Sequence, residues 1–278
     1  MPADNARALE KARSLPCDAV IIDLEDAVAP DGKAAARAQA LAAVQAGGFG
    51  GREVVIRVNG RDTPWGAADL AAAVEAQPDA ILVPKVNDAA EMAAYDAAIS
   101  GRPRLWAMIE TCQAVFQLDA IGRAAATSRL DAWVIGTNDL AKEMRCRPGA
   151  DRAPLLAALS LAVTAARAHG LVVIDGVYND IANAEGLARE CAQGADFGFD
   201  GKSLIHPGQI APTNAAFSPA QAEVAWARGV VAAFALPENA DKGVVKVDGK
   251  MTERLHLAQA ERVIALAEAV VRHEADSR

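Results

Sequence analysis

The sequence lacks the features that would place the chain outside the cytoplasm or build it around sulfur ligands. It has four cysteines among 278 residues, and no two of them form a CxxC pair. A disulfide framework or a zinc site is therefore not expected, and reduced, mostly buried thiols are expected instead. Charged and polar residues interrupt every apolar run, so no run reaches the roughly 20 residues needed to cross a bilayer.

The N-terminus also lacks a secretory signal. Residues 1–16 are polar and look like the start of a helix, with no basic segment followed by an apolar one. We therefore predict a cytoplasmic protein that does not contact a membrane. The formal net charge of −8 argues against nucleic acid as a partner and means that local cations must meet any anionic substrate.

Short apolar runs rich in Val and Ile recur along the chain, with Ala-rich helical segments between them. Seven runs are predicted to be strands: DAVIID from Asp18, EVVIRV from Glu53, DAILVPK from Asp79, RLWAMIE from Arg104, DAWVIG from Asp131, LVVIDG from Leu171 and ADFGFDG from Ala195. Strands that alternate with helices indicate βα units and a parallel sheet, and their spacing fits a TIM (β/α)8 barrel better than an open doubly wound sheet. No GxGxxG motif follows an early strand, which disfavours a Rossmann site.

A (β/α)8 barrel needs one strand more than the sequence supplies. The chain opens in a loop and helix, so we expect that the first strand is missing from it, that the true start lies upstream, and that Met1 is an internal methionine. The pattern changes after Pro219, where a helix, an irregular piece, a hairpin-like VVKVDGK and a final helix from about Leu255 follow. We predict a barrel at 1–218 and a C-terminal helical extension at 219–278 that acts as a lid.

Two carboxylates follow neighbouring predicted strands, at the strand ends where a barrel gathers its chemistry. Glu110 ends the run LWAMIE, and Asp139 follows WVIGTN. Two carboxylates that converge there cannot both stay ionised cheaply without a cation between them. Two carboxylates with room for waters and substrate are what Mg²⁺ prefers. We therefore predict a metal-assisted enzyme with Mg²⁺, for which Mn²⁺ could substitute, at Glu110 and Asp139.

Other polar groups at these strand ends predict how a substrate is bound. The guanidinium of Arg57 could hold a carboxylate or a thioester oxygen by paired hydrogen bonds, or could form an internal salt bridge to the acidic residues of DLED at 23–26. Free backbone N–H groups at the start of a predicted helix could hold a substrate carboxylate, at Gly136, Thr137 and Asn138.

Lysines end two of the predicted strands and allow a different chemistry. Lys202 is predicted to contact the substrate. A buried lysine at such a position, either Lys85 or Lys202, could instead form a Schiff base with a ketone, as metal-free aldolases do. That alternative would leave Glu110 and Asp139 without a role.

These motifs together resemble the HpcH/HpaI aldolase and citrate lyase β-subunit-like superfamily, in its branch of CoA-ester lyases. The resemblance runs from Met1 to about Ala267 and rests on long motifs in the right order: DAVIIDLEDAVAPDGKAAAR, VVIRVNG, ILVPKV, AMIET, IGTNDLA, DGVYNDIAN, GFDGKSLIHPGQI and DGKMTERLH. It implies a TIM barrel, in a homotrimer or hexamer, that binds one Mg²⁺ through Glu110 and Asp139. It also implies that Arg57 stabilises the enolate of an acyl-CoA.

The resemblance further implies a C-terminal segment that covers the active site of a neighbouring subunit and supplies an acidic catalytic residue. Many lyases of this group carry aspartate in a GKMxDxPH-type segment, whereas this chain has GKMTERLH with Glu253 at that place. We predict that Glu253, from a second subunit, moves the proton. We also predict that Asp23 is a catalytic residue. Together with Glu25 and Asp26 it is expected to order metal-bound waters.

We predict an Mg²⁺-dependent C–C lyase that reversibly cleaves a 3-hydroxy-dicarboxylic acyl-CoA, of the malyl-CoA, β-methylmalyl-CoA or citramalyl-CoA type, into an acyl-CoA and a 2-oxo acid. Three alternatives stay open. A CoA-independent aldolase on 4-hydroxy-2-oxo acids would share the fold and the metal. An acyl-CoA thioesterase would use the same site, and a non-catalytic scaffold would carry a decayed one.

Overall fold

The chain forms two compact units in the computed structural model, which describes residues 1–276, with side chains through residue 273. The first unit runs from Met1 to Thr213, and the second begins at Asn214. Helix α10 (Ile210–Phe217) crosses this division. The boundary expected from the sequence lies just beyond that helix, between residues 218 and 219.

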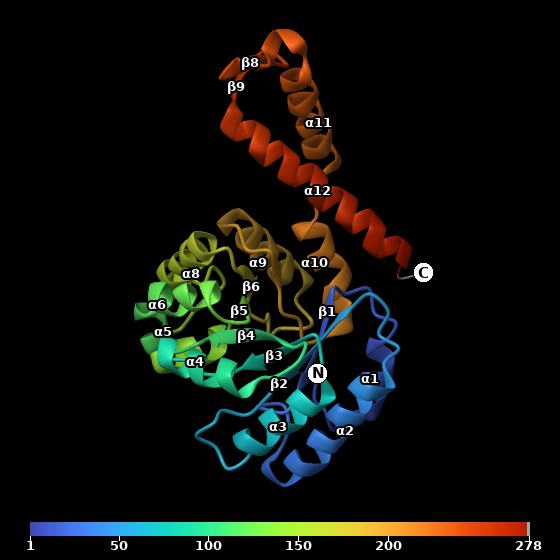
Figure 1. Ribbon diagram of the computed structural model, residues 1–278, viewed down its shortest axis with the longest axis vertical. Helices are drawn as coiled ribbons and strands as arrows, with labels where there is room; N and C mark the ends of the chain where they lie inside the picture. The colour runs from blue at the N-terminus through green and yellow to red at the C-terminus, as the bar shows by residue number, and fades with distance from the viewer. Residues whose placement is uncertain (277–278) are drawn as a thin grey trace. The chain divides into compact units, whose positions relative to one another are not determined.

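The first unit is built on a parallel sheet of seven strands in the order β1 to β7 (Figure 1). The strands are β1 (Ala19–Asp23), β2 (Glu53–Arg57), β3 (Ala80–Val83), β4 (Arg104–Ile109), β5 (Leu130–Ile135), β6 (Val172–Asp175) and β7 (Gly201–Lys202). Apart from one bridge between Pro2 and Asp23, no strand of the described residues extends the sheet beyond β1 or β7. The predicted barrel-type fold with seven of its strands is confirmed, and the expectation of an upstream start stays a prediction.

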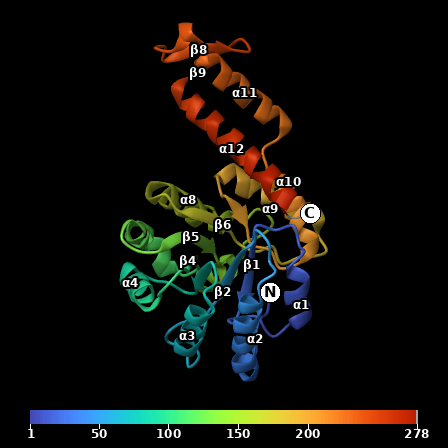
Figure 2. The ribbon, with the colours of Figure 1, turned by 45° about the vertical axis from the view of Figure 1, so that its right-hand side comes forward.

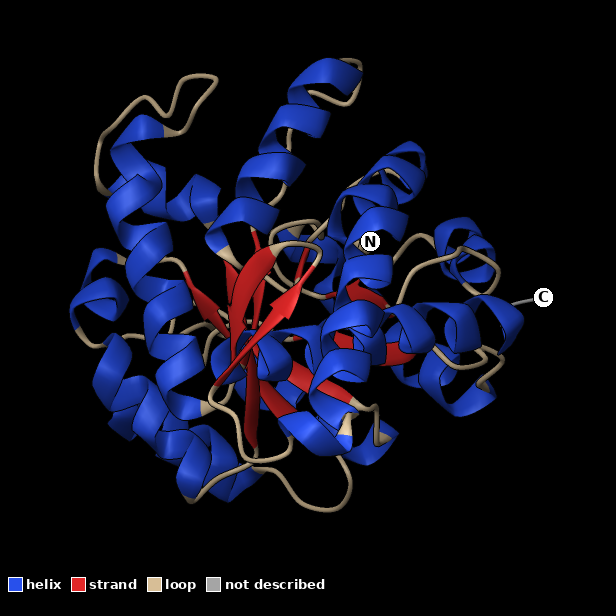
Figure 3. Ribbon diagram, turned by 90° about the horizontal axis from the view of Figure 1, so that it is seen from above, coloured by secondary structure: helices blue, strands red, loops and turns tan. Residues whose placement is uncertain are grey.

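Helices follow the strands and cover the outside of the curled sheet (Figure 2). Seen from above, the strands occupy the middle and helices surround them (Figure 3). The α-helices of this unit are α1 (Ala6–Ala12), α2 (Lys33–Ala46), α3 (Gly66–Ala76), α4 (Ala89–Ala98), α5 (Cys112–Phe116), α6 (Leu118–Arg123), α7 (Thr137–Glu143), α8 (Leu156–His169) and α9 (Ala184–Phe197). Short 3₁₀ turns precede or follow them, at η1 (Pro30–Gly32), η2 (Ala124–Ala126), η3 (Ala153–Leu155) and η4 (Pro207–Gln209).

Both faces of the sheet are buried, which explains why its strands are nearly continuous apolar runs. Successive residues of a strand point to opposite faces. Val55, Leu82 and Trp106 pack together on one face. Ile81 and Trp133, both 0% exposed, occupy the other face beneath the helices. The charged residues that end the strands are therefore held on a rigid, apolar base.

One predicted strand is wrong in part. The run ADFGFDG was expected to be a strand from Ala195, but α9 continues to Phe197 and ends at Gly198, whose φ of 89° only glycine adopts easily. The backbone N–H of Gly198 donates to Ala195 O at 2.9 Å, which closes the last turn. Only Gly201 and Lys202 pair with β6. The alternating aromatic and glycine residues of this run resemble a strand pattern, but residues 195–197 form the last turn of α9.

The second unit consists of two helices and a hairpin that share a small apolar core. Its elements are α11 (Gln221–Ala235), η5 (Pro237–Asn239), β8 (Val244–Val247), β9 (Lys250–Glu253) and α12 (Arg254–Asp276). The core includes Val230, Phe234, Val245 and Ala260. The order of helix, irregular piece, hairpin and helix predicted from the sequence is confirmed. Within residues 1–276, neither α12 nor any shorter helix combines the length and apolarity that a bilayer crossing requires.

Truncating the sheet core should cost far more stability than the same change on a helix surface. Leu82 is 1% exposed in the core, whereas Leu161 on α8 is 53% exposed. We expect Leu82→Ala to lower the free energy of unfolding by about 2–5 kcal/mol, because it removes buried methyl groups and leaves a cavity. Leu161→Ala should change it by less than about 0.5 kcal/mol. Urea unfolding followed by circular dichroism measures both, and equal effects would contradict this packing.

Candidate active site

The carboxyl ends of five neighbouring strands bring most of the predicted site residues to one edge of the sheet. Asp23 ends β1, Arg57 ends β2, Lys85 follows β3, Glu110 follows β4, and Asp139 lies in the first turn of α7 after β5. Parallel strands in consecutive order place these ends side by side. The residues come from segments far apart in the chain, and the sheet alone makes them neighbours.

Arg57 is held by acidic side chains of the first loop. Its Nε and Nη2 donate to the two oxygens of Asp23, each at 2.6 Å. Its Nη1 pairs with Glu25 at 2.8 Å and lies 3.9 Å from Asp26. Burial would lower the pKa of Arg57, but the Asp23 and Glu25 carboxylates raise it above its usual value. The salt bridge considered from the sequence is therefore present, and it makes Arg57 a permanent, oriented cation whose side chain is 16% exposed.

Asp23 serves to orient Arg57, and its geometry does not suit proton transfer. Besides the paired bonds from Arg57, its oxygens accept the backbone N–H groups of Glu25 and Ala27 at 2.9 and 3.1 Å. Burial would raise the pKa of Asp23, but Arg57 and these N–H groups lower it below its usual value. A carboxylate stabilised in this way is a poor base.

Lys85 links the first loop to the two predicted metal ligands. Its Nζ donates to Glu25 Oε1 and lies 4.0 Å from Asp139 Oδ2, while its backbone N–H donates to Glu110 Oε1 at 2.8 Å. Burial raises the pKa of Glu25, although Arg57 and Lys85 oppose this. Lys85 itself has a φ of 49°, a conformation that non-glycine residues adopt only where their surroundings enforce it. A Schiff-base role would require this ammonium to leave Glu25.

Glu110 is a buried carboxyl with too little positive charge around it. It is 1% exposed. Burial, and then the neighbouring charge of Glu25, raise its pKa to about 7, and Asp139 adds to this effect. Residue 136 must be glycine here, because a β-carbon would overlap the Glu110 carboxylate. Asp139 is more open, with 27% of its side chain exposed.

The other residues predicted at the start of α7 lie beside Asp139. Thr137 is 7% exposed and packs under the helix start. The Asn138 side chain exchanges amide hydrogen bonds with Asn179, at 2.7 and 3.3 Å. The Asn138 side chain is therefore engaged with the loop after β6, which leaves its backbone N–H as the group predicted to bind a substrate.

The structure does not support substrate contact by Lys202. Its side chain is 0% exposed, and its Nζ donates to Asp175 at 3.1 Å and to Glu190 at 2.6 Å. A third bond, of 2.5 Å, goes to the carbonyl of Gly176. All three donor positions of the ammonium are thus used inside the protein. The same contacts argue against a Schiff base at Lys202.

Glu253 belongs to the second unit, where it ends β9. It is exposed, and its backbone N–H donates to His256 Nδ1 at 3.0 Å. Its carboxylate makes no hydrogen bond or ion pair with the side chains described, those of residues 1–273. Its proposed role at the site of a second subunit stays a prediction.

Sequence reasoning missed Lys33, which shapes the first loop from below. Lys33 is 5% exposed. Its Nζ donates to the carbonyls of Leu24 and Glu25, at 2.8 and 2.7 Å, and to Asn59 Oδ1 at 2.9 Å. These bonds fix the backbone at Leu24 and Glu25. The sequence carries no clear signal for this, because a lysine at a helix start usually points into solvent.

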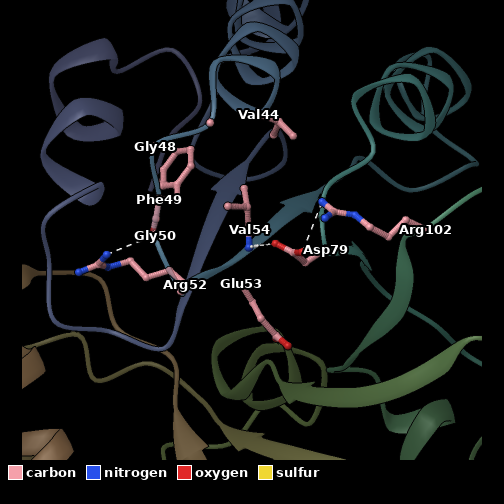
Figure 4. Close-up of a pocket in the computed structure, with 11 residues that line it drawn as sticks. Val44, Gly48, Phe49, Gly50, Arg52, Glu53, Val54, Asp79 and Arg102 are labelled. Atoms are coloured by element: carbon pink, nitrogen blue, oxygen red, sulfur yellow. Dashed lines mark hydrogen bonds and ion pairs between the residues drawn. The ribbon is translucent and has the colours of Figure 1, made fainter. Parts of the chain in front are cut away.

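Two hollows lie at opposite ends of the strands. A cavity of about 330 Å³ borders Glu25 and Lys85 and extends over the loop at 59–65. Another, of about 350 Å³, lies at the amino ends of β2 and β3, around the glycine-rich loop at 47–51 (Figure 4). Asp79 and Arg102 line this second cavity, and it does not share any lining residue with the first. Only the first adjoins the candidate site.

The donor set at the candidate site suits a hard divalent cation that keeps waters. Among the side chains described, those of residues 1–273, no group of three or more His, Cys, Asp or Glu is arranged to hold a metal ion. Glu110 and Asp139 would thus supply only two ligands and leave positions for water and substrate, as Mg²⁺ requires. The raised pKa of Glu110 fits this assignment, because a bound cation would favour the ionised carboxylate.

Comparison with known proteins gives the family. The family model described as HpcH/HpaI aldolase/citrate lyase matches residues 1–207. A protein named (3S)-malyl-CoA thioesterase, from Cereibacter sphaeroides strain KD131, is 50% identical over 270 residues, which cover 97% of this chain and 93% of the relative. The citrate lyase subunit beta of Leuconostoc mesenteroides subsp. cremoris is 34% identical and is matched over 97% of this chain and 92% of its own length.

Solved structures show the same relationship. CitE from Mycobacterium tuberculosis, in complex with magnesium, acetoacetate and coenzyme A, is 29% identical, with a TM-score of 0.79 and coverage of 96% of both chains. RipC from Yersinia pestis is 30% identical, with a TM-score of 0.69 over 81% of this chain and 95% of its own. The likeness therefore extends to the arrangement of the strands and not only to local motifs.

These relatives correct the predicted reaction. We expected a C–C lyase. Several relatives that are about 50% identical over 97% of the chain are instead named (3S)-malyl-CoA thioesterase, whereas the citrate lyase subunits are more distant. The thioesterase alternative is the one that they support. The family resemblance itself is confirmed: the chain belongs to the HpcH/HpaI aldolase/citrate lyase family of enzymes.

Proposed function

We propose that the protein hydrolyses the thioester of a 3-hydroxy-dicarboxylic acyl-CoA, of which (3S)-malyl-CoA is the representative. The similarity to (3S)-malyl-CoA thioesterase, at 50% identity over 97% of the chain, carries this proposal. Water adds to the thioester carbonyl carbon, the C–S bond breaks, and the leaving thiolate takes up a proton. The products are the free dicarboxylic acid and CoA.

We propose that the guanidinium of Arg57 binds the carbonyl oxygen of the thioester. Negative charge develops on that oxygen as water adds, and a fixed cation in a partly buried site stabilises it without having to reorganise. Asp23 holds Arg57 by two bonds of 2.6 Å, so its proposed role is that of a positioning residue. The cavity beside Glu25 and Lys85 is proposed to receive part of the thioester.

We propose that Glu110 and Asp139 hold Mg²⁺, as predicted from the sequence. Magnesium in the CitE complex supports this for the family. When bound, the ion would supply a Lewis-acidic positive charge for a substrate oxygen. The Lys85 ammonium donates to Glu25 and lies 4.0 Å from Asp139, so it balances part of the negative charge of these carboxylates.

Glu253 is proposed as the residue that accepts the proton of the attacking water, from a neighbouring subunit of a homotrimer or hexamer. The exposure of this carboxylate and its lack of described partners are compatible with the role. The backbone N–H groups of Thr137 and Asn138 are proposed to bind the substrate's free carboxylate. The sequence also predicted this role for Gly136, but the Gly136 N–H donates to the carbonyl of Ile109 at 3.0 Å.

Removing the charge of Glu110 should stabilise the metal-free protein at alkaline pH. Its pKa is raised from about 4.5 to about 7 on folding, so the unfolded chain ionises at lower pH than the folded protein. The free energy of unfolding therefore falls as the pH rises from about 4.5 to about 7, by roughly 3 kcal/mol at most. In EDTA, Glu110→Gln should exceed the wild type in urea midpoint at pH 8, with a much smaller difference at pH 5.

The matched control is Glu185→Gln, since the Glu185 side chain is 93% exposed. It should leave the urea midpoint nearly unchanged at both pH values. If Glu110→Gln gave the same difference at pH 5 as at pH 8, the charge of Glu110 would not be the cause.

The reaction should release CoA and malate from (3S)-malyl-CoA in equal amounts. A thiol reagent measures CoA, and mass spectrometry in H₂¹⁸O should find one labelled oxygen in the new carboxylate, because the attacking water becomes part of it. Acetyl-CoA and glyoxylate, assayed as its phenylhydrazone, would be the products if a C–C bond broke instead. Their formation in place of malate would reject the proposed hydrolysis.

Arg57→Lys should slow this hydrolysis by about 100-fold or more, because an ammonium cannot reproduce the paired bonds of a guanidinium. The control Arg104→Lys changes an arginine at the amino end of β4, whose partner is Asp131 at 2.7 Å. It should keep the wild-type rate. A rate for Arg57→Lys within a few-fold of the wild type would remove Arg57 from the reaction.

A further inference from the structure

Four charged side chains are buried together beneath the carboxyl ends of β6 and β7, and the proposed reaction uses none of them. They are Arg152, Asp175, Glu190 and Lys202, with side chains 4%, 0%, 10% and 0% exposed. Two are positive and two are negative. Burying charge is costly, and a set of apolar side chains of the same volume would often be as stable or more so. The cluster is better explained by what its hydrogen bonds hold in place.

The bonds of the cluster converge on the backbone of one residue, Gly176. Lys202 Nζ donates to the Gly176 carbonyl at 2.5 Å, and the Gly176 N–H donates to Asp175 Oδ1 at 2.8 Å. Arg152 Nη1 donates to both oxygens of Asp175, at 2.7 and 2.9 Å, and Lys202 donates to Glu190 at 2.6 Å. The backbone at Gly176 is thus fixed on both sides of its Cα, through the N–H and through the carbonyl.

Gly176 in turn supports the start of α7. A β-carbon at residue 176 would lie 2.5 Å from Thr137 Oγ1 and 2.9 Å from the carbonyl of Ile135, so only glycine fits against this turn. Thr137 is the first residue of α7, and Asp139 follows two positions later in the same turn. A shift of the backbone at Gly176 toward α7 would therefore press on Thr137, two residues before Asp139.

The conformation of Arg152 is consistent with such a support. Its φ of 55° lies in the left-handed region, which a non-glycine residue keeps only where its contacts over-determine it. Its Nε donates to Gln193 Oε1 at 2.8 Å, in addition to the bonds of Nη1 to Asp175. Bonds of fixed direction specify a position in a way that apolar packing of equal strength does not.

We propose that Lys202 and Arg152 are positioning residues that set the start of α7, and with it Asp139, by fixing the backbone at Gly176. The expected effect on Mg²⁺ binding rests on the proposed role of Asp139 as a metal ligand. The expected effect on the backbone of α7 does not rest on it. Lys202, which the sequence predicted to contact the substrate, therefore acts on the site indirectly, through Gly176 and the start of α7.

The test combines Lys202→Met with Glu190→Leu, which keeps the buried charges balanced because Arg152 and Asp175 remain paired. Hydrogen exchange of the metal-free protein should show faster exchange for the amides of α7 than in the wild type. Calorimetric titration with Mg²⁺ should show an affinity lower by about tenfold or more, as is usual when groups that orient metal ligands are lost.

A matched control changes a buried arginine at the opposite end of the strands. Arg52 is 7% exposed, and its Nε and Nη1 donate to the carbonyls of Leu15 and Phe49. Arg52→Met should lower the melting temperature without changing exchange in α7 or the affinity for Mg²⁺. If the double variant matched Arg52→Met in both measurements, the cluster would be structural only and the proposal would be overturned.

Gly176→Ala provides a second test that leaves all four charges intact, in case the double variant does not fold. It should also accelerate exchange in α7 and weaken Mg²⁺ binding, because the added methyl group meets Thr137. Unchanged exchange in this variant would overturn the proposal. Faster exchange in α7 of both the double variant and Gly176→Ala, together with a wild-type protein that binds no Mg²⁺, would support the positioning role and reject the proposed metal site instead.

Discussion

The electrostatic balance at the carboxyl ends of the strands is the constraint on which the rest of the site depends. Arg57 neutralises Asp23 and shares Glu25, and Lys85 binds Glu25 from the other side. Glu110 lies behind these pairs without a full countercharge, and its burial, followed by the charge of Glu25, raises its pKa to about 7. The deficit is concentrated on one buried carboxyl, which is the arrangement that makes a divalent cation favourable there.

The same residues can serve two reactions, which explains why the sequence motifs predicted the wrong one. A guanidinium and a Lewis-acidic ion stabilise negative charge on oxygen, whether that charge arises from an enolate or from water adding to a thioester. Arg57, Glu110 and Asp139 are compatible with either. Which bond breaks depends on where water and the acid/base group stand, and relatedness over the whole chain was needed to favour the C–S bond.

Much of the fold was predictable because local pattern and burial agree. Helix α2 (Lys33–Ala46) is one of the Ala-rich segments expected to be helical between the strands, and the strand-end positions of Arg57 and Glu110 follow from apolar runs alone. Lys202 shows the limit: it ends a strand as expected, but its partners lie 12 and 27 residues away in sequence, and nothing in the motif indicates that the ammonium turns inward. Glu253 shows a second limit of prediction from the sequence, because the active site on which it is proposed to act belongs to a different copy of the chain.

The glycine at residue 136 also restricts how this site can change over evolutionary time. A side chain there would collide with the Glu110 carboxylate, so the two positions cannot vary independently. Glu110 Cβ would lie 2.5 Å from the added β-carbon, so losing only the acidic group would not make room for alanine at 136. A relative without the proposed metal ligand is therefore expected to keep glycine at 136, and a single substitution at 110 could then restore the acid.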